Sequence, residues 1–449
     1  MINTRRPQKR VSGASIAVAA FSTIVEWYDF TLYLYLAAVL SRVFFGGGET
    51  ALTTILATFA IAYLLRPLGG MVFGHIGDRF GRRRTMLLSV AIMTMTMFGT
   101  ALLPTHARAG AAAGWLLFLL RCIMGFSVGG EYNAVVAYLL EGAPRNRRGL
   151  IASMASASSE VGGLLAVGVS LLTVNSMSPA NLDSWGWRIP FLVGAVLAAS
   201  VWIARTTMEE SPDFNEQRAS GTVPMSPLHY ALTNYRAGIL RAFAISALGS
   251  ITYYVGITYV PAFLTSAGKL GEGESLRLST VAAFAVILVT PLTGALSDRL
   301  GRKSVLIFLS ACSAILPVAL FYLIARGSPS YALFGIVILA CVAGAVSAVG
   351  AITAAEQFPG EGRISGLALG ATTATAIFGG LTPYVAQILT ERTGWTLVPG
   401  AMIAVVAVCV LPILITLPET APRYVEPASG RLTASTPSKS GSPDAPARS

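Results

Sequence analysis

Two acids and a tyrosine are spaced to share one face of a helix in the first apolar stretch of the chain. Glu26 and Asp29 are three residues apart, and Tyr33 follows Asp29 by four. Two carboxylates in a poorly solvated place repel each other and lose hydration, so we expect at least one of them to bind a proton near neutral pH. This is chemistry suited to carrying protons. Structural hydrogen bonds to a neighbouring helix are the alternative explanation of the pair.

A guanidinium group lies in another apolar stretch and needs an anionic partner. Arg121 opens a series with Gly125 and Gly129, whose four-residue steps allow close packing against a second helix. The planar fork of an arginine binds a carboxylate through two parallel hydrogen bonds. We expect the partner to be an anionic ligand, Asp29 or Glu26, and a fixed structural ion pair is the alternative.

The ionisable groups inside apolar stretches are concentrated in the first half of the chain. Glu131 and Glu160 join the groups above as further candidates for a proton path, and no acid follows in the second-half stretches until Glu356. We therefore expect one deep arginine, Arg121, to face four acids. That balance favours a small carboxylate or a zwitterion as ligand over a tricarboxylate.

The second half is expected to supply polar and aromatic contacts. Tyrosines offer a hydroxyl donor and a ring face that can hold a quaternary ammonium group, but they also anchor helices at membrane interfaces. We favour the anchor interpretation for Tyr259. The candidate ligand-binding residues are Tyr28, Tyr33, Arg121, Tyr132, Tyr253 and Tyr254.

The composition of the chain indicates that transmembrane helices position these residues. Hydrophobic residues make up 54% of the 449-residue chain and charged residues only 12%, too few charges to cover a soluble surface. Stretches long enough to cross about 30 Å of hydrocarbon predict an all-α integral membrane protein with twelve transmembrane helices. The predicted spans are 15–40, 51–73, 85–103, 114–140, 150–174, 188–207, 238–264, 276–296, 304–325, 331–356, 364–390 and 394–417.

An internal repeat divides these helices into two groups of six. The string GHIGDRFGRRR from Gly74 to Arg84 recurs as GALSDRLGRKS from Gly294 to Ser304, each copy at the end of the second span of its half. The acid, proline and arginine of Glu141, Pro144 and Arg148 also recur later at the same spacing. Two repeated helical halves are typical of secondary transporters, which place a site between them.

We predict that the repeated strings form a gate. Glycines would permit tight turns, Asp78 would face the positive N-terminal end of a neighbouring helix, and the arginines would pair with acids such as Glu141. The alternative is that these arginines only set the orientation in the membrane. The predicted gate residues are Gly74, Asp78, Arg79, Gly81, Arg82, Glu141, Arg148, Asp298, Arg299, Gly301, Arg302, Glu356 and Arg363.

The net charge of +11 does not indicate a nucleic-acid partner, because most basic residues fall in the N-terminus, in alternate loops and in the tail. This bias predicts that both termini are cytoplasmic. The predicted divisions are an N-terminal segment 1–14, a six-helix bundle 15–207, a central cytoplasmic loop 208–237, a second bundle 238–417 and a disordered tail 418–449.

Enzyme chemistry and bound cofactors are not expected. The three histidines, His75, His106 and His229, lie near loops, and no nucleotide or metal motif appears. The four cysteines have no paired metal-ligand spacing, so no metal site is predicted.

Seven motifs along nearly the whole chain carry a family resemblance. They are EWYDF (26–30), RPLGGMVFGHIGDRFGRR (66–83), RCIMGFSVGGEY (121–132), YLLEGAPRNRRG (138–149), WRIPF (187–191), ESPDF (210–214) and FGGLTPY (378–384). The chain resembles the major facilitator superfamily and, within it, the metabolite:proton symporters, which include oxoglutarate, citrate, shikimate and proline/betaine permeases.

This resemblance implies a secondary active transporter that works by alternating access. We expect proton-coupled uptake of a small metabolite that bears a carboxylate, such as an oxoglutarate-like acid or a zwitterion such as proline or betaine. A proton-driven exporter of organic compounds and a passive channel are the alternatives. The expected setting is the cell inner membrane, with protons, a small-molecule substrate and lipid as partners, and a monomer as the functional unit.

Overall fold

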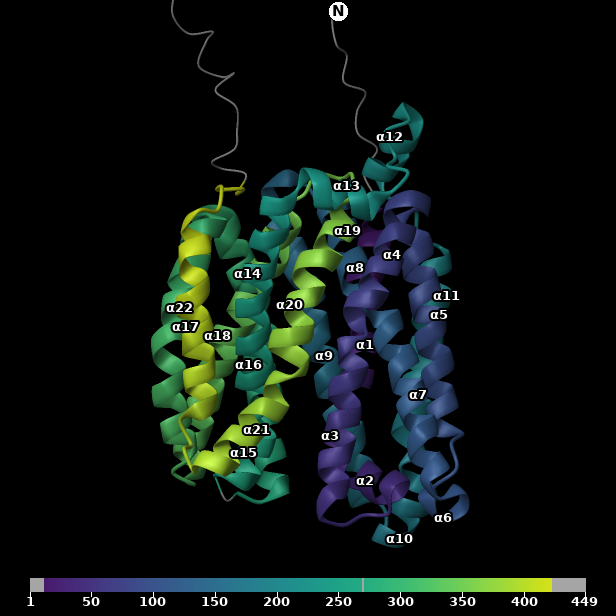
Figure 1. Ribbon diagram of the computed structural model, residues 1–449, viewed down its shortest axis with the longest axis vertical. Helices are drawn as coiled ribbons and strands as arrows, with labels where there is room; N and C mark the ends of the chain where they lie inside the picture. The colour runs from purple at the N-terminus through teal and green to yellow at the C-terminus, as the bar shows by residue number, and fades with distance from the viewer. Residues whose placement is uncertain (1–11, 269, 422–449) are drawn as a thin grey trace, which may run out of the picture.

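The computed structural model describes residues 12–421 without residue 269, and within them the chain is helical with no strand. Two helix bundles stand side by side, and their helices run roughly along the long axis of the molecule (Figure 1). The prediction of a disordered tail falls largely on residues 422–449, outside the described part of the chain.

The first bundle is built from the N-terminal half. Its helices are α1 (Gly13–Tyr35), α2 (Ala37–Phe45), α3 (Glu49–Leu64), α4 (Arg66–Phe80), α5 (Arg82–Ala101), α6 (His106–Ala109), α7 (Ala111–Val128), α8 (Glu131–Gly142), α9 (Arg148–Asn175), α10 (Pro179–Asn181) and α11 (Arg188–Thr206), with short η1 (Arg145–Arg147) and η2 (Leu182–Gly186). The central segment then carries α12 (Pro212–Ser220) and α13 (Pro227–Asn234).

The second bundle follows the same plan with more irregular helices. Its elements are α14 (Arg236–Tyr253), η3 (Tyr254–Thr258), α15 (Val260–Ser266), α16 (Glu272–Leu300), α17 (Arg302–Ile324), α18 (Pro329–Ala355), α19 (Arg363–Leu367), η4 (Ala368–Thr372), α20 (Thr373–Thr375), η5 (Ala376–Gly380), α21 (Thr382–Thr393) and α22 (Val398–Ile415). The π-helical turns η4 and η5 interrupt the helix from α19 to α21, which contacts α3 and α4 of the first bundle, and η3 lies between α14 and α15. Such turns often mark functional sites.

The membrane fold predicted from the sequence is confirmed. Eleven stretches of the described residues are helical, long and apolar enough to cross a membrane, and the helix pair Gly13–Tyr35 and Val39–Phe45 makes a twelfth span when taken together. The span predicted over 15–40 is thus made of two helices, which are bent by 76° relative to each other.

Each repeated string breaks a pair of helices at a glycine. Gly81 separates α4 from α5 with a φ of 113°, and Gly301 separates α16 from α17 with a φ of 101°. These angles are strained for residues with a side chain, so the predicted turns need glycine there. Gly74 lies inside α4 instead of in a turn, where a Cβ atom would come 3.2 Å from the Cα of Ser365, so this glycine permits close approach of the two halves.

The two ends of the molecule differ in how the bundles meet. The end that carries Ser12, α12, α13 and Ala421, here called the termini end, brings α4 against α19 and α9 against α16 (Figure 1). The opposite end carries α2, α6 and α10 on one bundle and α15 and α21 on the other (Figure 1).

Close packing of α1 on α9 gives a first testable prediction. A Cβ atom on Gly162 would lie 2.3 Å from the carbonyl oxygen of Ile24 in α1, whereas one on Gly168 in the same helix would meet nothing within 4 Å. Gly162→Ala should therefore destabilise the protein by about 1–3 kcal/mol, and Gly168→Ala should leave stability unchanged. Thermal unfolding of the detergent-purified variants, followed by tryptophan fluorescence, measures this, and equal midpoints for both would contradict the packing.

Candidate functional site

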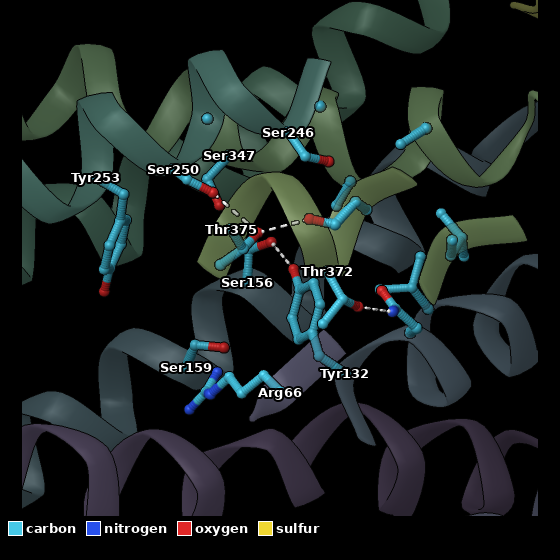
Figure 2. A pocket seen from close by; sticks show the side chains of 18 of the residues that line it. Arg66, Tyr132, Ser156, Ser159, Ser246, Ser250, Tyr253, Ser347, Thr372 and Thr375 are labelled. Atoms are coloured by element: carbon cyan, nitrogen blue, oxygen red, sulfur yellow. Dashed lines mark hydrogen bonds between the residues drawn. The ribbon is translucent and has the colours of Figure 1, made fainter. Parts of the chain in front are cut away.

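A cavity of about 140 Å³ lies between the two bundles, halfway along the helices. This central cavity is shown from close by in Figure 2. Its polar and aromatic lining comes from both halves: Glu26, Trp27, Tyr63, Arg66, Tyr132, Asn133, Ser156, Ser159 and Glu160 from the first, and Ser246, Ser250, Tyr253, Tyr254, Ser347, Thr372 and Thr375 from the second.

The two walls of the central cavity differ in charge. All three charged lining residues, Glu26, Arg66 and Glu160, belong to the first half. The second half presents hydroxyl groups and aromatic rings. The Asn133 amide donates to the Thr372 hydroxyl over 2.6 Å, so a neutral hydrogen bond joins the walls.

Arg66 holds the first acid of the predicted proton pair. Its Nη1 lies 3.4 Å from Oε1 of Glu26 and donates to the Tyr63 hydroxyl over 2.9 Å. The guanidinium also lies over the Tyr63 ring, 4.0 Å from the ring centroid, an arrangement that stabilises a cation by cation–π attraction.

Arg121 binds Asp29 inside the first half. Nη1 donates to one carboxylate oxygen over 2.8 Å, and Nη2 donates to the other over 3.3 Å and to the Thr100 hydroxyl over 3.2 Å. Of the three partners left open by the sequence, Asp29 is thus the one in contact. The pair lines a small separate pocket and does not line the central cavity, unlike Glu26.

A third buried ion pair was missed by the sequence analysis. Arg205, near the end of α11, donates to both Glu131 and Ser22, and also to the carbonyl oxygen of Met86 over 2.7 Å. The prediction of a single deep arginine is therefore wrong, because Arg66, Arg121 and Arg205 are each paired with an acid in the first half. Arg205 lies two residues before the end of the predicted span 188–207 and was not counted among the deep groups, yet its side chain is fully buried.

The predicted ligand-binding tyrosines separate into two groups. Tyr132, Tyr253 and Tyr254 line the central cavity. Tyr28 and Tyr33 do not line it, because their hydroxyls donate to the carbonyl oxygens of Pro190 and Ile55 within the first half.

Tyr259 is not the membrane anchor that we expected. It is only 3% exposed, and its hydroxyl donates to Oε1 of Gln387 over 2.8 Å. The tyrosine lines a second cavity, described next, instead of facing lipid.

An aromatic layer separates the central cavity from this second, distal cavity of about 420 Å³. The layer consists of Trp27, Phe30, Tyr63, Tyr253 and Tyr254, whose rings contact one another across the two halves. The hydroxyls of Tyr63 and Tyr254 are in hydrogen-bond contact. Tyr253 and Glu160 line both cavities.

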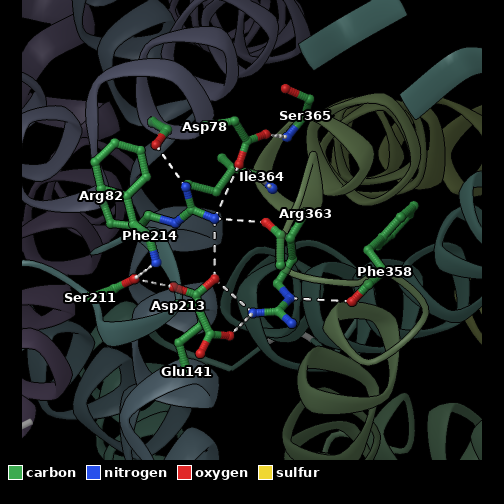
Figure 3. A network of polar contacts seen from close by, with 12 residues as sticks. Asp78, Arg82, Glu141, Ser211, Asp213, Phe214, Phe358, Arg363, Ile364 and Ser365 are labelled. Carbon is green, nitrogen blue, oxygen red and sulfur yellow. Dashed lines mark hydrogen bonds and ion pairs between the residues drawn. The ribbon is translucent and has the colours of Figure 1, made fainter. Parts of the chain in front are cut away.

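At the termini end, a buried ionic network ties the halves together (Figure 3). The Asp78 carboxylate accepts hydrogen bonds from the backbone N–H groups of Ile364 and Ser365, at 3.4 and 2.9 Å, in the first turn of α19. Helix N-termini attract anions because their N–H groups are unpaired and the helix dipole is positive there. The prediction that Asp78 faces a helix N-terminus is confirmed.

Glu141 lies at the centre of this first ionic network. One of its oxygens accepts from Arg82 over 3.2 Å and from Arg363 of the other half over 2.7 Å. The Ser211 hydroxyl donates to its second oxygen over 2.5 Å. Arg363 lies 3.7 Å from Asp213, farther than from Glu141, so Glu141 is the stronger partner of Arg363. Burial and the nearby Glu141 raise the pKa of Asp213, and Arg363 only partly offsets this effect.

The second half repeats this network. Asp298 accepts from the N–H groups of Gly149 and Leu150, at 2.9 and 3.1 Å, in the first turn of α9. Arg302 binds Asp298 over 2.8 Å and Glu356 over 3.2 Å. The sequence repeat therefore corresponds to two copies of one contact.

Two further acids brace the networks and were not predicted. Glu210, in the ESPDF motif, accepts from the N–H groups of Arg82 and Arg83 at the start of α5. Glu419 does the same for Arg302 and Lys303 at the start of α17. The next residue in each case has a hydroxyl that donates to the glutamate of the network, Ser211 to Glu141 and Thr420 to Glu356. This repeated pair of an acid and a hydroxyl residue is visible in the sequence.

Three predicted gate arginines lie at the margins of these networks. Arg79 is exposed and donates to the carbonyl oxygen of Met225 over 3.4 Å instead of pairing with an acid. Arg299 is also exposed, and Arg148 opens α9 beside the second network. The buried contacts are made by Arg82, Arg302 and Arg363.

Comparison with known proteins agrees with this architecture. Residues 15–222 match the family "Sugar (and other) transporter" and residues 270–443 match "Major Facilitator Superfamily". The proton:xylose symporter XylE bound to 6-bromo-6-deoxy-D-glucose has the same fold, with a TM-score of 0.77 at 20% identity over 91% of this chain and 96% of that one.

Two curated relatives cover most of both chains. The alpha-ketoglutarate permease of Escherichia coli (strain K12) is 36% identical over 84% of this chain and 87% of its own. The proline/betaine transporter of the same organism is 30% identical over 92% of this chain and 85% of its own. The twelve-span helical fold and these matches show that the chain belongs to the Major Facilitator Superfamily of membrane transporters.

Proposed function

We propose that this chain is a proton-coupled symporter that takes up a small carboxylate-bearing metabolite, or a zwitterion, across the cell inner membrane. The relatives include an alpha-ketoglutarate permease, a proline/betaine transporter and a citrate-proton symporter, which support the class of substrate and the coupling to protons. The distribution of basic residues supports cytoplasmic termini. The cavities and networks belong to one chain, so we propose a functional monomer.

The observation that carries this proposal is a central cavity closed at one end by two copies of the same ionic network. With cytoplasmic termini, the closed end is the cytoplasmic one, and the larger distal cavity faces outward. Transport by alternating access then requires the contacts of Asp78 and Asp298 with the opposite half to break while the aromatic layer closes. We assign the predicted gate residues to this function.

The proton would travel through the acids of the first half. Asp29 is held by Arg121, and Glu26 and Glu160 line the cavity. An acid inside a membrane protein exchanges its proton when its cationic partner is drawn away or returns. Glu131 stays a secondary candidate, since Arg205 holds it away from the cavity.

Substrate-panel uptake tests the class of transporter. Right-side-out vesicles with an imposed inward proton gradient should accumulate one of 2-oxoglutarate, shikimate, citrate, L-proline or glycine betaine, and uptake should acidify the lumen. Accumulation driven by an outward proton gradient would instead identify an exporter that works by antiport. Equilibration of the substrate across the membrane that does not depend on either proton gradient would identify a channel.

The proton role of Asp29 makes a second prediction. Asp29→Asn removes the ionisable partner of Arg121 and should abolish accumulation driven by protons, while exchange of labelled for unlabelled substrate continues. Glu26→Gln should also lose accumulation or shift its pH optimum. Exchange serves as the control for folding, and accumulation at the wild-type level in Asp29→Asn would remove this residue from the mechanism.

The gate makes a third prediction. Asp78→Asn weakens two charge-assisted hydrogen bonds to the α19 turn, so the population open to the cytoplasm should rise about tenfold, which corresponds to about 1.4 kcal/mol. A membrane-impermeant thiol reagent added from the cytoplasmic side measures this at an Ala351→Cys reporter in the cavity, after removal of the four native cysteines.

A matched variant controls for loss of an acid as such. Asp183 forms an exposed ion pair with Arg42 at the opposite end of the first half, so Asp183→Asn should leave cytoplasmic labelling unchanged. Equal labelling in Asp78→Asn, Asp183→Asn and the parent would reduce the repeated string to a signal for orientation in the membrane.

A further inference from the structure

Arg66 differs from the other two deep arginines because one of its terminal nitrogens, Nη2, makes no hydrogen bond among the described residues. Arg121 uses both terminal nitrogens on Asp29 and Thr100, and Arg205 uses both on Met86, Ser22 and Glu131. Both hydrogen bonds of Arg66 in the described part of the chain leave from Nη1, and its Nε, like the Nε of Arg121 and of Arg205, is buried without a partner there. Of the three, Arg66 alone lines the central cavity.

The opposite wall of the cavity also has unused donors. Ser246 and Ser347 line the cavity and make no hydrogen bond within the described part of the chain. Figure 2 shows Arg66 and Ser159 on one side of the cavity and Ser246, Ser250 and Ser347 on the other. A ligand between them would meet a cation at one end and neutral hydroxyls at the other.

The contact between Arg66 and Glu26 is the loosest of the three deep ion pairs. Its 3.4 Å separation compares with 2.8 Å for Arg121 and Asp29, and the second oxygen of Glu26 has no partner. The other charges that act on Glu26 are Glu131 on α8 and Arg205 on α11. These two form an ion pair with each other, so their effects on Glu26 oppose each other, and Arg66 is the cation that pairs with Glu26 directly.

We propose that Arg66 binds the carboxylate of the substrate and that Glu26 takes up the coupled proton in the same step. This inference rests on the proposed function and names the residue that recognises the substrate. The Nε and Nη2 edge of an arginine binds a carboxylate through two parallel hydrogen bonds. The incoming carboxylate draws Arg66 away from Glu26, one proton from the solvent adds to a Glu26 oxygen, and the net charge of the site is unchanged.

Arg66 also connects this step to the aromatic layer. Its Nη1 donates to the Tyr63 hydroxyl, which contacts the Tyr254 hydroxyl of the other half. A shift of the guanidinium towards a bound carboxylate therefore changes a hydrogen bond between the halves on the outer side of the cavity. Substrate binding and closure of the aromatic layer would be linked through one side chain.

Isothermal titration calorimetry of the purified chain in lipid nanodiscs tests the assignment, with 2-oxoglutarate and L-proline as probes. Arg66→Gln should weaken binding of the probe that the wild type binds by about 10- to 100-fold, the effect expected for hydrogen bonds to charged groups. Arg66→Lys keeps the charge but loses the planar fork, and should weaken binding by about tenfold. Arg326→Gln, an exposed arginine beside Tyr322, is the matched control and should bind normally.

Titration in two buffers of different ionisation enthalpy measures the proton. The wild type should take up about one proton for each carboxylate bound at neutral pH, and Glu26→Gln should bind the probe without taking up a proton. If Arg66→Gln does not fold, the Lys variant decides. Wild-type affinity in the Arg66 variants, or undiminished proton uptake in Glu26→Gln, would overturn the assignment.

Failure of the proposed function gives a different result. In that case the wild type accumulates no carboxylate-bearing compound of the vesicle panel, and the assignment of Arg66 falls with it. If the wild type accumulates such a compound and the Arg66 variants bind it as tightly as the wild type, only the assignment fails.

Discussion

A carboxylate bound to the first turn of a helix in the opposite half is the contact on which the rest of this structure depends. Asp78 makes it with α19 and Asp298 makes it with α9. The same two helices continue into the walls of the central cavity, where α9 carries Ser156, Ser159 and Glu160, and the α19–η4–α20 segment carries Thr372 and Thr375. The two ionic networks therefore set the relative positions of the charged and the hydroxyl wall.

Much of the fold could be predicted because lipid leaves a chain few options. Backbone groups in hydrocarbon must be paired within helices, so apolar stretches of sufficient length identify the spans. The repeated string forms two copies of one contact. The backbone N–H groups that bind Asp298 and Asp78 belong to Gly149 and Ile364, which are 215 residues apart and occupy equivalent positions after the repeated arginines Arg148 and Arg363. Local features, such as the 76° bend in the first span, were harder to predict from the sequence.

The candidate site was only partly predictable, because the sequence does not give the rotation of a helix or the depth of its ends. The acids at membrane depth could be counted from the sequence, and Glu26 and Glu160 line the cavity. Arg205 lies close to the end of a predicted span, whereas Arg66 lies inside one and was not counted among the deep groups. The break at Leu65 sets Arg66 beside the cavity, and the length of α11 buries Arg205.

The hydrogen bonds of Glu210 and Glu419 lie within one half each, so they would stay intact if the two halves moved relative to each other. Each of these acids holds the start of a helix in its own half, as do the pairs of Arg82 with Glu141 and of Arg302 with Glu356. Among the described residues, the polar contacts that cross between the halves at this end are chiefly those of the two aspartates, of Arg363, and of Arg82 with the carbonyl oxygen of Gly360. In the transport cycle proposed above, each half would therefore rotate as a preassembled block, and the polar contacts to be broken would lie at the seam between the halves.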